Sequence, residues 1–273
     1  MKLRHMMAAS VMSAGVMLNP VNVNAEQGKL FSEDQQGQIQ VIIKDYLLNN
    51  PEILLEVSKA LQKKQQSKMM DQATQAIEGN ADQLFNAPNT PFIGNAKGDV
   101  TIVEFFDYQC VHCKKMAPVL NNLITKNKNV KVLFKDFPIF GKSSVFASEA
   151  VLAAQMQGKY HALHEALINK SQRLSPAVVL KAADEVGINT TKLKADMKSD
   201  TVQKALLANR QLAEKLHLMG TPAFVVASTP EGTFSKGSET FFIPGAASEE
   251  TLADLVSKAM PKDDAEKLSM PQG

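Results

Sequence analysis

Cysteine is scarce in this sequence: there are two among 273 residues, three positions apart, at Cys110 and Cys113. A chain of this size does not need a disulfide to fold, in contrast to many small secreted domains. Hydrophobic residues make up 44% of the chain, which supports a core of its own. The pair therefore has to be explained as a structural bridge, a metal site or a reactive group.

Long hydrophobic runs are also missing. Beyond residue 25, no stretch approaches the roughly 18 continuous apolar residues of a transmembrane helix. Residues 1–25, MKLRHMMAASVMSAGVMLNPVNVNA, begin with basic side chains, continue with a short apolar run and end at Ala25. That pattern is typical of a secretory signal peptide, and a membrane-anchored N-terminus is the alternative. We expect an exported, soluble mature chain in a compartment that permits disulfides.

An excess of charge of either sign is absent as well. Without residues 1–25 the chain has 28 basic and 28 acidic residues. A formally neutral chain has no general electrostatic attraction to nucleic acid or anionic lipid, so neither is expected as a partner. The sequence also contains no internal repeat. What remains is long enough for one large domain, or for a domain with an appendage.

Periodicity, proline and glycine divide the rest of the chain into regions. Two amphipathic helices are predicted first, separated by a break at Asn49-Asn50-Pro51. Either they lie on the main domain, or they pair with the same helices of a second chain. The regions are an N-terminal helical region at 26–80, a linker at 81–98, a main domain at 99–261 and a flexible tail at 262–273.

The main domain is predicted to be of the α/β class, with a small mixed sheet and helices on both faces. A long helical block is expected to separate the first pair of strands from the second pair. The expected elements are a strand at 100–106, a helix at 111–127 that contains Pro118, a strand at 130–138, the helical block at about 143–217, strands at 222–228 and 232–245, and a helix at 248–260.

Two of the three roles for the cysteines have little support. A bridge across so short a loop would contribute about 2 kcal/mol, a modest gain for a chain with an ample core. A structural zinc site usually has four nitrogen or sulfur ligands, and the sequence has no second CxxC motif. His161 and His164 share a helix face, but an exposed helix is a simpler explanation of that spacing than a ligand pair.

Redox chemistry has a positive argument. The order strand, CxxC, helix places Cys110 at a helix N-terminus, where unpaired N–H groups and the helix dipole favour an anion. A lowered thiol pKa would make Cys110 the exposed, attacking sulfur. Cys113, one turn further along, is placed to resolve a mixed disulfide. His112 adds positive charge or a hydrogen bond beside the thiolate, although elsewhere it would be taken for an ordinary surface residue.

Three segments together resemble the DsbA-like thiol:disulfide oxidoreductases. They are EFFDYQCVHCKKMAPVL (104–120), VKVLFKDFPIFG (130–141) and GTPAFVV (220–226), within a resemblance that covers roughly residues 92–260. The resemblance implies a thioredoxin-like fold with an inserted helical domain. Here that fold would be preceded by an N-terminal α-helical extension.

The resemblance also implies roles for three residues outside the CxxC motif. Pro222 matches the family's cis-proline, which lies against the active-site disulfide. Thr221 before it would leave a backbone N–H and C=O free to pair with a substrate strand. Glu104 matches a buried acid that shuttles the proton of Cys113, and the alternative is an ordinary salt bridge with Lys135.

The same resemblance bears on the direction of the reaction. Val111, His112 and Thr221 are expected to set the redox potential. Thr221 is a departure, since strongly oxidising members carry an apolar residue there and threonine is found in disulfide isomerases. Some members have an extension that resembles YLLNNPEILLEVSKALQ (46–62) and forms a homodimer, so we expect a homodimer through residues 32–78.

Taken together, these residues predict a periplasmic enzyme, free or associated with the envelope, that introduces and isomerises disulfides. Its redox-active disulfide would be Cys110–Cys113, with no metal and no organic cofactor. The expected partners are exported cysteine-containing proteins and a membrane redox partner, a quinone-linked oxidase or a reductase. The alternative is a non-catalytic envelope binding protein on a thioredoxin-like scaffold.

Overall fold

The computed structural model describes residues 31–261. The predicted signal peptide at 1–25 and the predicted tail at 262–273 lie outside these residues. By contacts the chain divides into two compact units, one ending at Leu61 and the other beginning at Gln62. Within the described part, no helix is both long enough and apolar enough to cross a membrane.

The first unit consists of α1 (Glu33–Asn49) and the start of α2 (Glu52–Gly79). The break between the helices was predicted, and it falls at the expected residues. Ser32 begins α1 with a capping box, in which its Oγ accepts from Gln35 N over 3.2 Å and its N–H donates to Gln35 Oε1 over 2.9 Å. No residue of α1 is buried, so its apolar side chains face solvent in the single chain.

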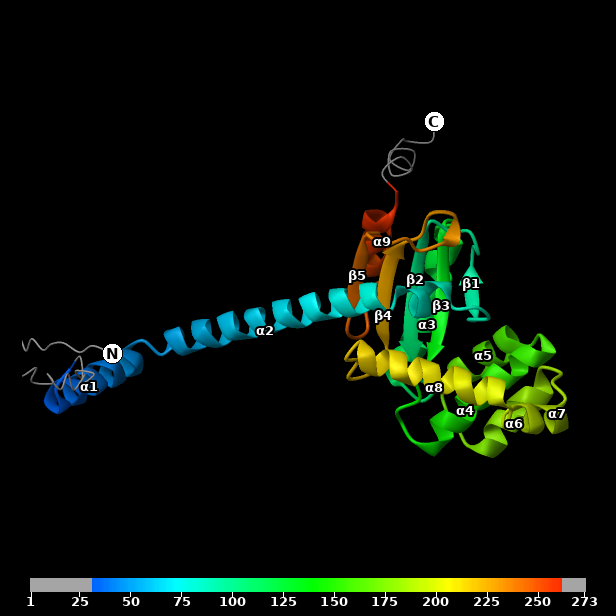
Figure 1. Cartoon of the computed structure of the whole chain (residues 1–273). Helices are drawn as coiled ribbons and strands as arrows, with labels where there is room; N and C mark the ends of the chain where they lie inside the picture. The colour runs from blue at the N-terminus through cyan, green and yellow to red at the C-terminus, as the bar shows by residue number, and fades with distance from the viewer. Residues whose placement is uncertain (1–30, 262–273) are drawn as a thin grey trace, which may run out of the picture. The chain divides into compact units, whose positions relative to one another are not determined.

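A five-stranded mixed sheet forms the centre of the second unit (Figure 1). The strand order is β1-β3-β2-β4-β5, in which β2 and β3 are parallel and the other neighbours are antiparallel. The central strands consist largely of β-branched and aromatic residues, as expected of strands covered on both faces. The strands are β1 (Phe92–Gly94), β2 (Val100–Phe106), β3 (Val130–Asp136), β4 (Ala223–Ser228) and β5 (Thr240–Ile243).

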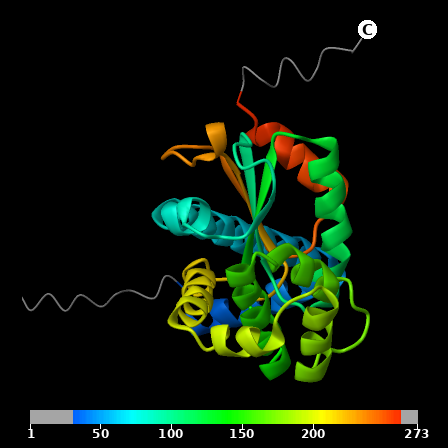
Figure 2. The same cartoon turned by 90° about the vertical axis from the view of Figure 1, so that its right-hand side faces the viewer.

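Helices cover both faces of this sheet, as predicted (Figure 2). On one face, α3 (Val111–Lys126) and α9 (Glu249–Ala259) share a core with the side chains of alternate residues of β2. On the other face, the C-terminal part of α2 and the end of α8 (Asp200–Lys215) pack against the remaining residues of β2. Alternation along a strand therefore gives the sheet two separate cores.

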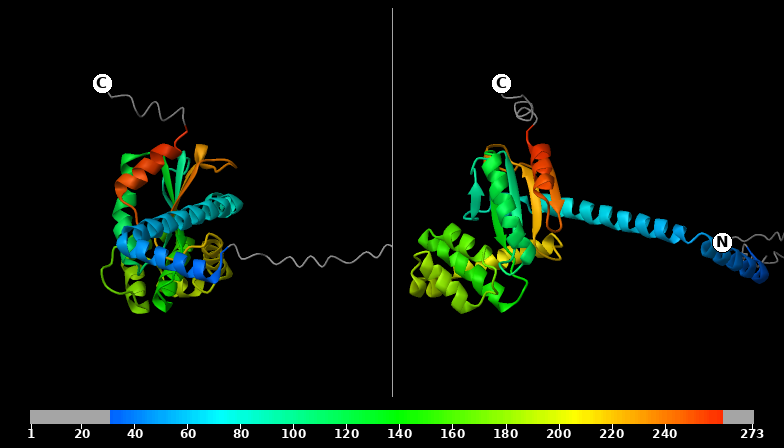
Figure 3. Two further views of the ribbon diagram at one scale, coloured as in Figure 1. Left: turned by 90° about the vertical axis from the view of Figure 1, so that its left-hand side faces the viewer. Right: turned by 180° about the vertical axis from the view of Figure 1, so that it is seen from behind.

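The helical block lies between β3 and β4 in sequence and at one end of the sheet in space (Figure 3). Its helices were predicted as a group at about 143–217. Their apolar faces bury small and branched residues in the same core as α3. The helices are α4 (Lys142–Ala154), α5 (Tyr160–Ile168), α6 (Pro176–Glu185), α7 (Thr190–Asp196) and α8, with a 3-10 turn at Gln155–Gln157.

The segment 81–98 is not the linker that its composition predicted. It contains a short π-helix (Asp82–Asn86) in which Leu84 and Phe85 are buried, and then strand β1 at the edge of the sheet. Its prolines, glycines and asparagines are typical of loops, and a strand of three residues is too short to show alternation. The segment is part of the packing of the second unit.

The strand expected at 232–245 is also shorter than predicted, because only β5 pairs with β4. Gly232 has φ of 78° and Gly237 has φ of 88°, so the chain turns in the left-handed region before it enters the sheet. A Cβ on Gly232 would overlap the main-chain oxygen of Ala96, which leaves no room for a side chain at this position. A 3-10 turn (Pro230–Gly232) precedes this loop.

Candidate active site

Cys110 is the N-cap residue of α3, as the sequence predicted. Its Sγ accepts a hydrogen bond from the main-chain N–H of Cys113 over 3.3 Å, and both cysteines are free thiols. Asp107 fixes the turn before the helix, since its Oδ1 accepts from Gln109 N over 2.7 Å and its Oδ2 accepts from Ile139 N over 2.8 Å. The helix N-terminus is therefore directed at the Cys110 sulfur.

The peptide bond between Thr221 and Pro222 is cis, in agreement with the prediction. The Cys110 Sγ lies 3.2 Å from the main-chain oxygen of Thr221, to which it donates when the thiol is protonated. Cys110 was expected to be exposed, and that is wrong: only 2% of it is accessible, against 1% of Cys113. The loop that carries Thr221 lies against the sulfur. Val111, between the two cysteines, is 62% exposed.

The two thiols have opposite acidities. A hydrogen bond from the Cys113 side chain is the main cause that lowers the pKa of Cys110 to about 5, against burial, which acts to raise it. Thr221 and the N–H groups of Cys113 and His112 lower it further. Burial raises the pKa of Cys113 well above its usual value, helped by the bond to Cys110 and by the charge of Glu104. Cys110 is therefore the thiolate of the pair, and Cys113 keeps its proton.

Glu104 lies on the same face of β2 as the core beneath the cysteines, and it is 4% exposed. Burial raises its pKa to about 8, and the charge of Cys110 adds to the effect. Glu104 and Cys113 both line a cavity of about 10 Å³, which is the size that one water molecule needs. The acid is thus placed beside the Cys113 thiol.

The alternative for Glu104, a salt bridge with Lys135, is not formed. In the sheet Glu104 is paired with Phe134, so the next residue of β3 points to the opposite face. The Lys135 Nζ donates instead to the Gln83 main-chain oxygen over 2.9 Å and to Thr90 Oγ1 over 3.1 Å. Burial lowers the pKa of Lys135 to about 8.

His164 was expected to share an exposed helix face with His161, and it is buried instead, at 4% exposure. Its Nδ1 lies 3.0 Å from the Tyr108 hydroxyl, inside a cluster of rings that includes Phe134 and Tyr160. Burial lowers its pKa to about 3, so the ring is neutral. No group of three or more metal-ligating His, Cys, Asp or Glu side chains occurs among residues 31–261.

Sequence reasoning missed Asp107 and Tyr108, although both belong to the quoted segment around the cysteines. Asp107 directly precedes a turn into a helix, which is a usual place for a capping carboxylate. Tyr108 has no sequence signal that would pair it with a histidine 56 positions later. Such a contact depends on how α5 packs against the sheet.

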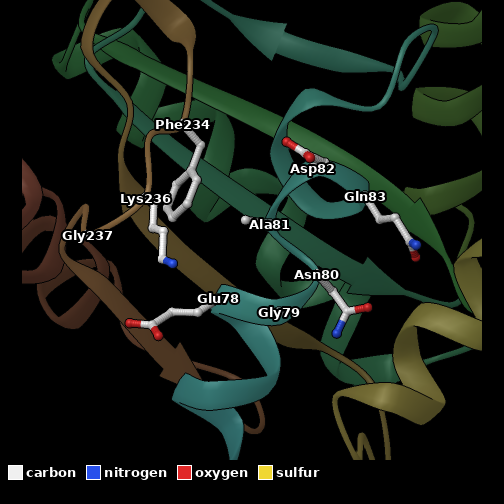
Figure 4. A pocket seen from close by; sticks show the side chains of 9 residues that line it. All are labelled: Glu78, Gly79, Asn80, Ala81, Asp82, Gln83, Phe234, Lys236 and Gly237. Atoms are coloured by element: carbon white, nitrogen blue, oxygen red, sulfur yellow. The ribbon is translucent and has the colours of Figure 1, made fainter.

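Another pocket, of about 360 Å³, is lined by neither cysteine. Figure 4 shows the residues that line it. It is formed by the end of α2, the π-helix and the loop before β5, with the ring of Phe234 at one side. That ring stacks on Phe85 at a centroid distance of 4.6 Å. None of the predicted site residues lines this pocket.

Residues 101–257 match the family described as DSBA-like thioredoxin domain. The chain belongs to that family, the DsbA-like thiol:disulfide oxidoreductases. Residues 35–68 match a second description, Copper resistance protein ScsC N-terminal domain. The predicted resemblance is thereby confirmed, and so is the predicted fold class, a thioredoxin-like fold with inserted helices and N-terminal helices.

Individual relatives agree with this assignment. A thioredoxin-like oxidoreductase from Silicibacter pomeroyi is 40% identical, with a TM-score of 0.60 over 65% of this chain and 96% of its own. A periplasmic thioredoxin-like protein from Salmonella enterica is 29% identical, with a TM-score of 0.56 over 66% and 94%. The thiol:disulfide interchange protein DsbA of Bordetella parapertussis is 28% identical over 159 residues, which are 56% of this chain and 74% of that protein.

The match to two other relatives is partial. The chain is 24% and 25% identical to two Na(+)/H(+) antiporters, NhaA 3 of Salinispora tropica and NhaA 1 of Salinispora arenicola. It spans 21% and 26% of their lengths.

Proposed function

We propose that this DsbA-like protein is a periplasmic thiol:disulfide oxidoreductase that introduces and isomerises disulfides in exported proteins. The observation that carries the proposal is the pair of thiols with opposite acidities, of which Cys110 contacts the main chain of the cis-proline loop. Cys110 and Cys113 are the proposed catalytic residues. Val111, His112, Thr221-Pro222 and Glu104 support them.

In oxidation, a substrate thiolate attacks the Cys110 sulfur of the Cys110–Cys113 disulfide. The bond between the cysteines breaks, Cys113 leaves as a thiolate and takes up a proton, and a mixed disulfide joins the substrate to Cys110. A second substrate thiolate then attacks the substrate sulfur and releases Cys110. Two electrons remain on the protein, and a membrane quinone-linked oxidase would remove them.

In isomerisation, the Cys110 thiolate attacks a substrate disulfide and releases one substrate thiolate. That thiolate, or another in the substrate, then attacks the mixed disulfide and releases Cys110, so no net electrons are transferred. A low pKa makes Cys110 a good leaving group in this second step. Thr221 supports this activity, because disulfide isomerases carry threonine at the position before the cis-proline.

The periplasmic location is part of the same proposal. Support comes from the signal-like residues 1–25 and from the periplasmic Salmonella enterica relative. A reductase in the membrane would keep Cys110 reduced when the protein isomerises. Secretion of the full-length chain with loss of residues 1–25, read by the mass of the protein released from the periplasm, tests the location.

We also propose that the N-terminal helices hold two copies together. The sequence predicted a dimer surface at residues 32–78. Ala73 and Ile77 are buried within the second unit, which begins at Gln62. We therefore place the proposed dimer contact at residues 33–61. The support is a set of exposed apolar side chains on α1 and early α2, Ile42 at 66% among them. Sedimentation should give a dimer at micromolar concentration and a monomer after Ile42→Asp, and a wild-type monomer would refute this proposal.

Trapping of mixed disulfides tests the catalytic function. Cys113→Ala should accumulate adducts with an unfolded substrate protein that carries scrambled disulfides, read on non-reducing gels. The Cys110 thiolate attacks a substrate disulfide and releases a substrate thiolate, and the resolving thiol is lost. Cys110→Ala should form none. A binding scaffold with a vestigial cysteine pair would give no adduct with either variant.

The reduction potential separates the two directions. A value near about −120 mV would make net oxidation the main activity, and a value near about −180 mV would favour isomerisation. A pair below about −300 mV would be a structural disulfide, which contradicts the proposed function.

A further inference from the structure

Two grooves of opposite chemistry flank Cys110. The first has a volume of about 800 Å³ and is formed by three elements: α2 from Gln62 onward, the loop from Leu216 to Pro222, and the chain after β5. None of the residues that line it is an aspartate, glutamate, lysine or arginine. Its apolar side chains include Met69, Met219 and Phe242.

This first groove begins at the reactive sulfur, because Thr221 lines it and also accepts the hydrogen bond from Cys110. Met219 is 97% exposed and Met69 is 61% exposed, so both present thioethers to whatever enters. Methionine is flexible and polarisable, and it adapts to apolar side chains of different shapes. The groove therefore suits apolar residues in general, without selecting one.

The second groove has a volume of about 610 Å³ and lies beside Cys110, because the chain neighbours Gln109 and Val111 line it. It contains three cations, Lys114, Lys115 and Arg173, and no acidic residue. The Lys114 Nζ is held by the Lys170 main-chain oxygen over 2.6 Å. Lys115 and Arg173 form no ion pair within the described chain, which leaves both charges available to a ligand.

We propose that the protein selects cysteines in an extended segment with apolar residues on one side and acidic residues on the other. The apolar residues would lie in the first groove, against Met69 and Met219. The acidic residues would lie in the second groove, beside Lys115 and Arg173. This inference rests on the proposed function, because the segment reaches both grooves only when its cysteine meets Cys110.

Continuity and charge complementarity identify the occupant. A segment bound at Cys110 passes Thr221 into the first groove and Val111 into the second, so a single extended chain spans both. Unpaired cations in a groove without acids attract carboxylates and raise the rate of encounter. Because residues of α2 line the first groove, that helix takes part in the choice of substrate. The exchange step itself is the attack on the Cys110–Cys113 disulfide described above.

The test uses the oxidised full chain and synthetic peptides with one cysteine. One pair of peptides carries leucines on one side of the cysteine and glutamates on the other, in both orders. Two further peptides carry lysine in place of glutamate, or serine in place of leucine. Stopped-flow measurement of the second-order rate should show one leucine–glutamate peptide reacting about tenfold faster than both substituted peptides. The preference over lysine should weaken with added salt.

Variants assign each side of the preference. Lys115→Glu and Arg173→Glu should reduce the preference for glutamate about tenfold, whereas Lys198→Glu, an exposed charge outside the grooves, should leave it unchanged. Met69→Gln and Met219→Gln should lower the rate with leucine peptides, whereas Leu207→Gln, also exposed, should not.

Reaction with β-mercaptoethanol separates this inference from the proposed function. If that small uncharged thiol reduces the protein normally while all peptides react alike, substrate selection by the grooves is wrong and the redox function stands. If neither the small thiol nor any peptide reacts, the proposed function fails. A second-order rate constant for the peptides that falls as protein concentration rises would mean that a second copy covers the first groove. That result also overturns the inference.

Discussion

The Cys110 thiol lies 3.2 Å from the main-chain oxygen of Thr221, although the two residues are 111 positions apart. This contact joins the start of α3 to the cis peptide before β4. It holds the reactive sulfur against a stretch of backbone that has no strand partner of its own. We therefore expect a substrate cysteine that reaches Cys110 to lie beside that backbone.

The acidity of Cys110 predicts the pH at which the reduced protein reacts. Alkylation by iodoacetamide needs the thiolate, so its rate should rise with a midpoint near pH 5, the pKa of Cys110. Cys113→Ala removes the largest cause of that low pKa and should move the midpoint upward. Rapid-quench alkylation followed by mass spectrometry provides the measurement. A wild-type midpoint between about pH 8 and 9, as in an ordinary thiol, would contradict the assignment.

Glu104 should govern the rate at which the Cys113 thiol attacks a mixed disulfide on Cys110. The Cys113 thiol keeps its proton, and a carboxyl with a pKa of about 8 beside it is suited to accept that proton near neutral pH. Glu104→Gln should slow resolution of a mixed disulfide on Cys110 by about 10²-fold at pH 7. The decay of an adduct with β-mercaptoethanol after rapid mixing measures this rate.

Alkylation of Cys110 is the control for that experiment. If Glu104→Gln slows resolution and also abolishes alkylation, the variant has damaged the site as a whole. An unchanged resolution rate with a folded variant would remove Glu104 from the mechanism.

Glu104 should also make stability depend on pH. Its pKa of about 8 in the folded protein lies above the usual value of 4.5, so folding disfavours the charged form. In the oxidised protein neither cysteine titrates, and burial, the larger cause of the raised pKa, remains. The free energy of unfolding should therefore fall as pH rises above about 4.5, by at most about 1.4 kcal/mol per pH unit. Glu104→Gln should flatten this decline. Denaturant titrations at several pH values measure it, and parallel curves for both proteins would be evidence against a buried, neutral acid.

The burial of Ile77 predicts how much the packing of the C-terminal part of α2 contributes to the free energy of unfolding. It is 1% exposed and packs in the core on the face of the sheet opposite the cysteines. Ile77→Ala should reduce the free energy of unfolding by about 2–5 kcal/mol. Leu207→Ala, at a 53% exposed position of α8, should change it by less than about 0.5 kcal/mol. Equal effects of the two variants would contradict the packing of α2 described here.

The sequence predicted most of what depends on local pattern. The helix break at Asn49-Asn50-Pro51, the strands at 100–106 and 222–228, and the position of Cys110 at a helix N-terminus all follow from periodicity and short motifs. The cis bond at Pro222 came from the family resemblance, because an X–Pro bond alone is seldom cis. These features need no knowledge of distant packing.

Features that depend on distant packing were missed or misjudged. Residues 81–98 have the composition of a loop. They are held in place by pairing with β3 and by Lys135, whose side chain lies on the face of the sheet opposite Glu104. His164 is buried because α5 turns it toward Tyr108, which periodicity along one helix does not show. Cys110 is covered by a loop that comes from more than a hundred positions away.

The alternation along β2 has a consequence for how the protein can change over evolution. Glu104 and Phe106 face the core beneath the cysteines, and Val103 and Phe105 face the core that anchors α2. Successive residues of β2 thus contact two separate cores, one beneath the cysteines and one beneath α2. Substitutions that retune the redox pair and substitutions that remodel the helical extension can accumulate independently, so one catalytic domain is free to acquire, alter or lose its extension while its chemistry is preserved.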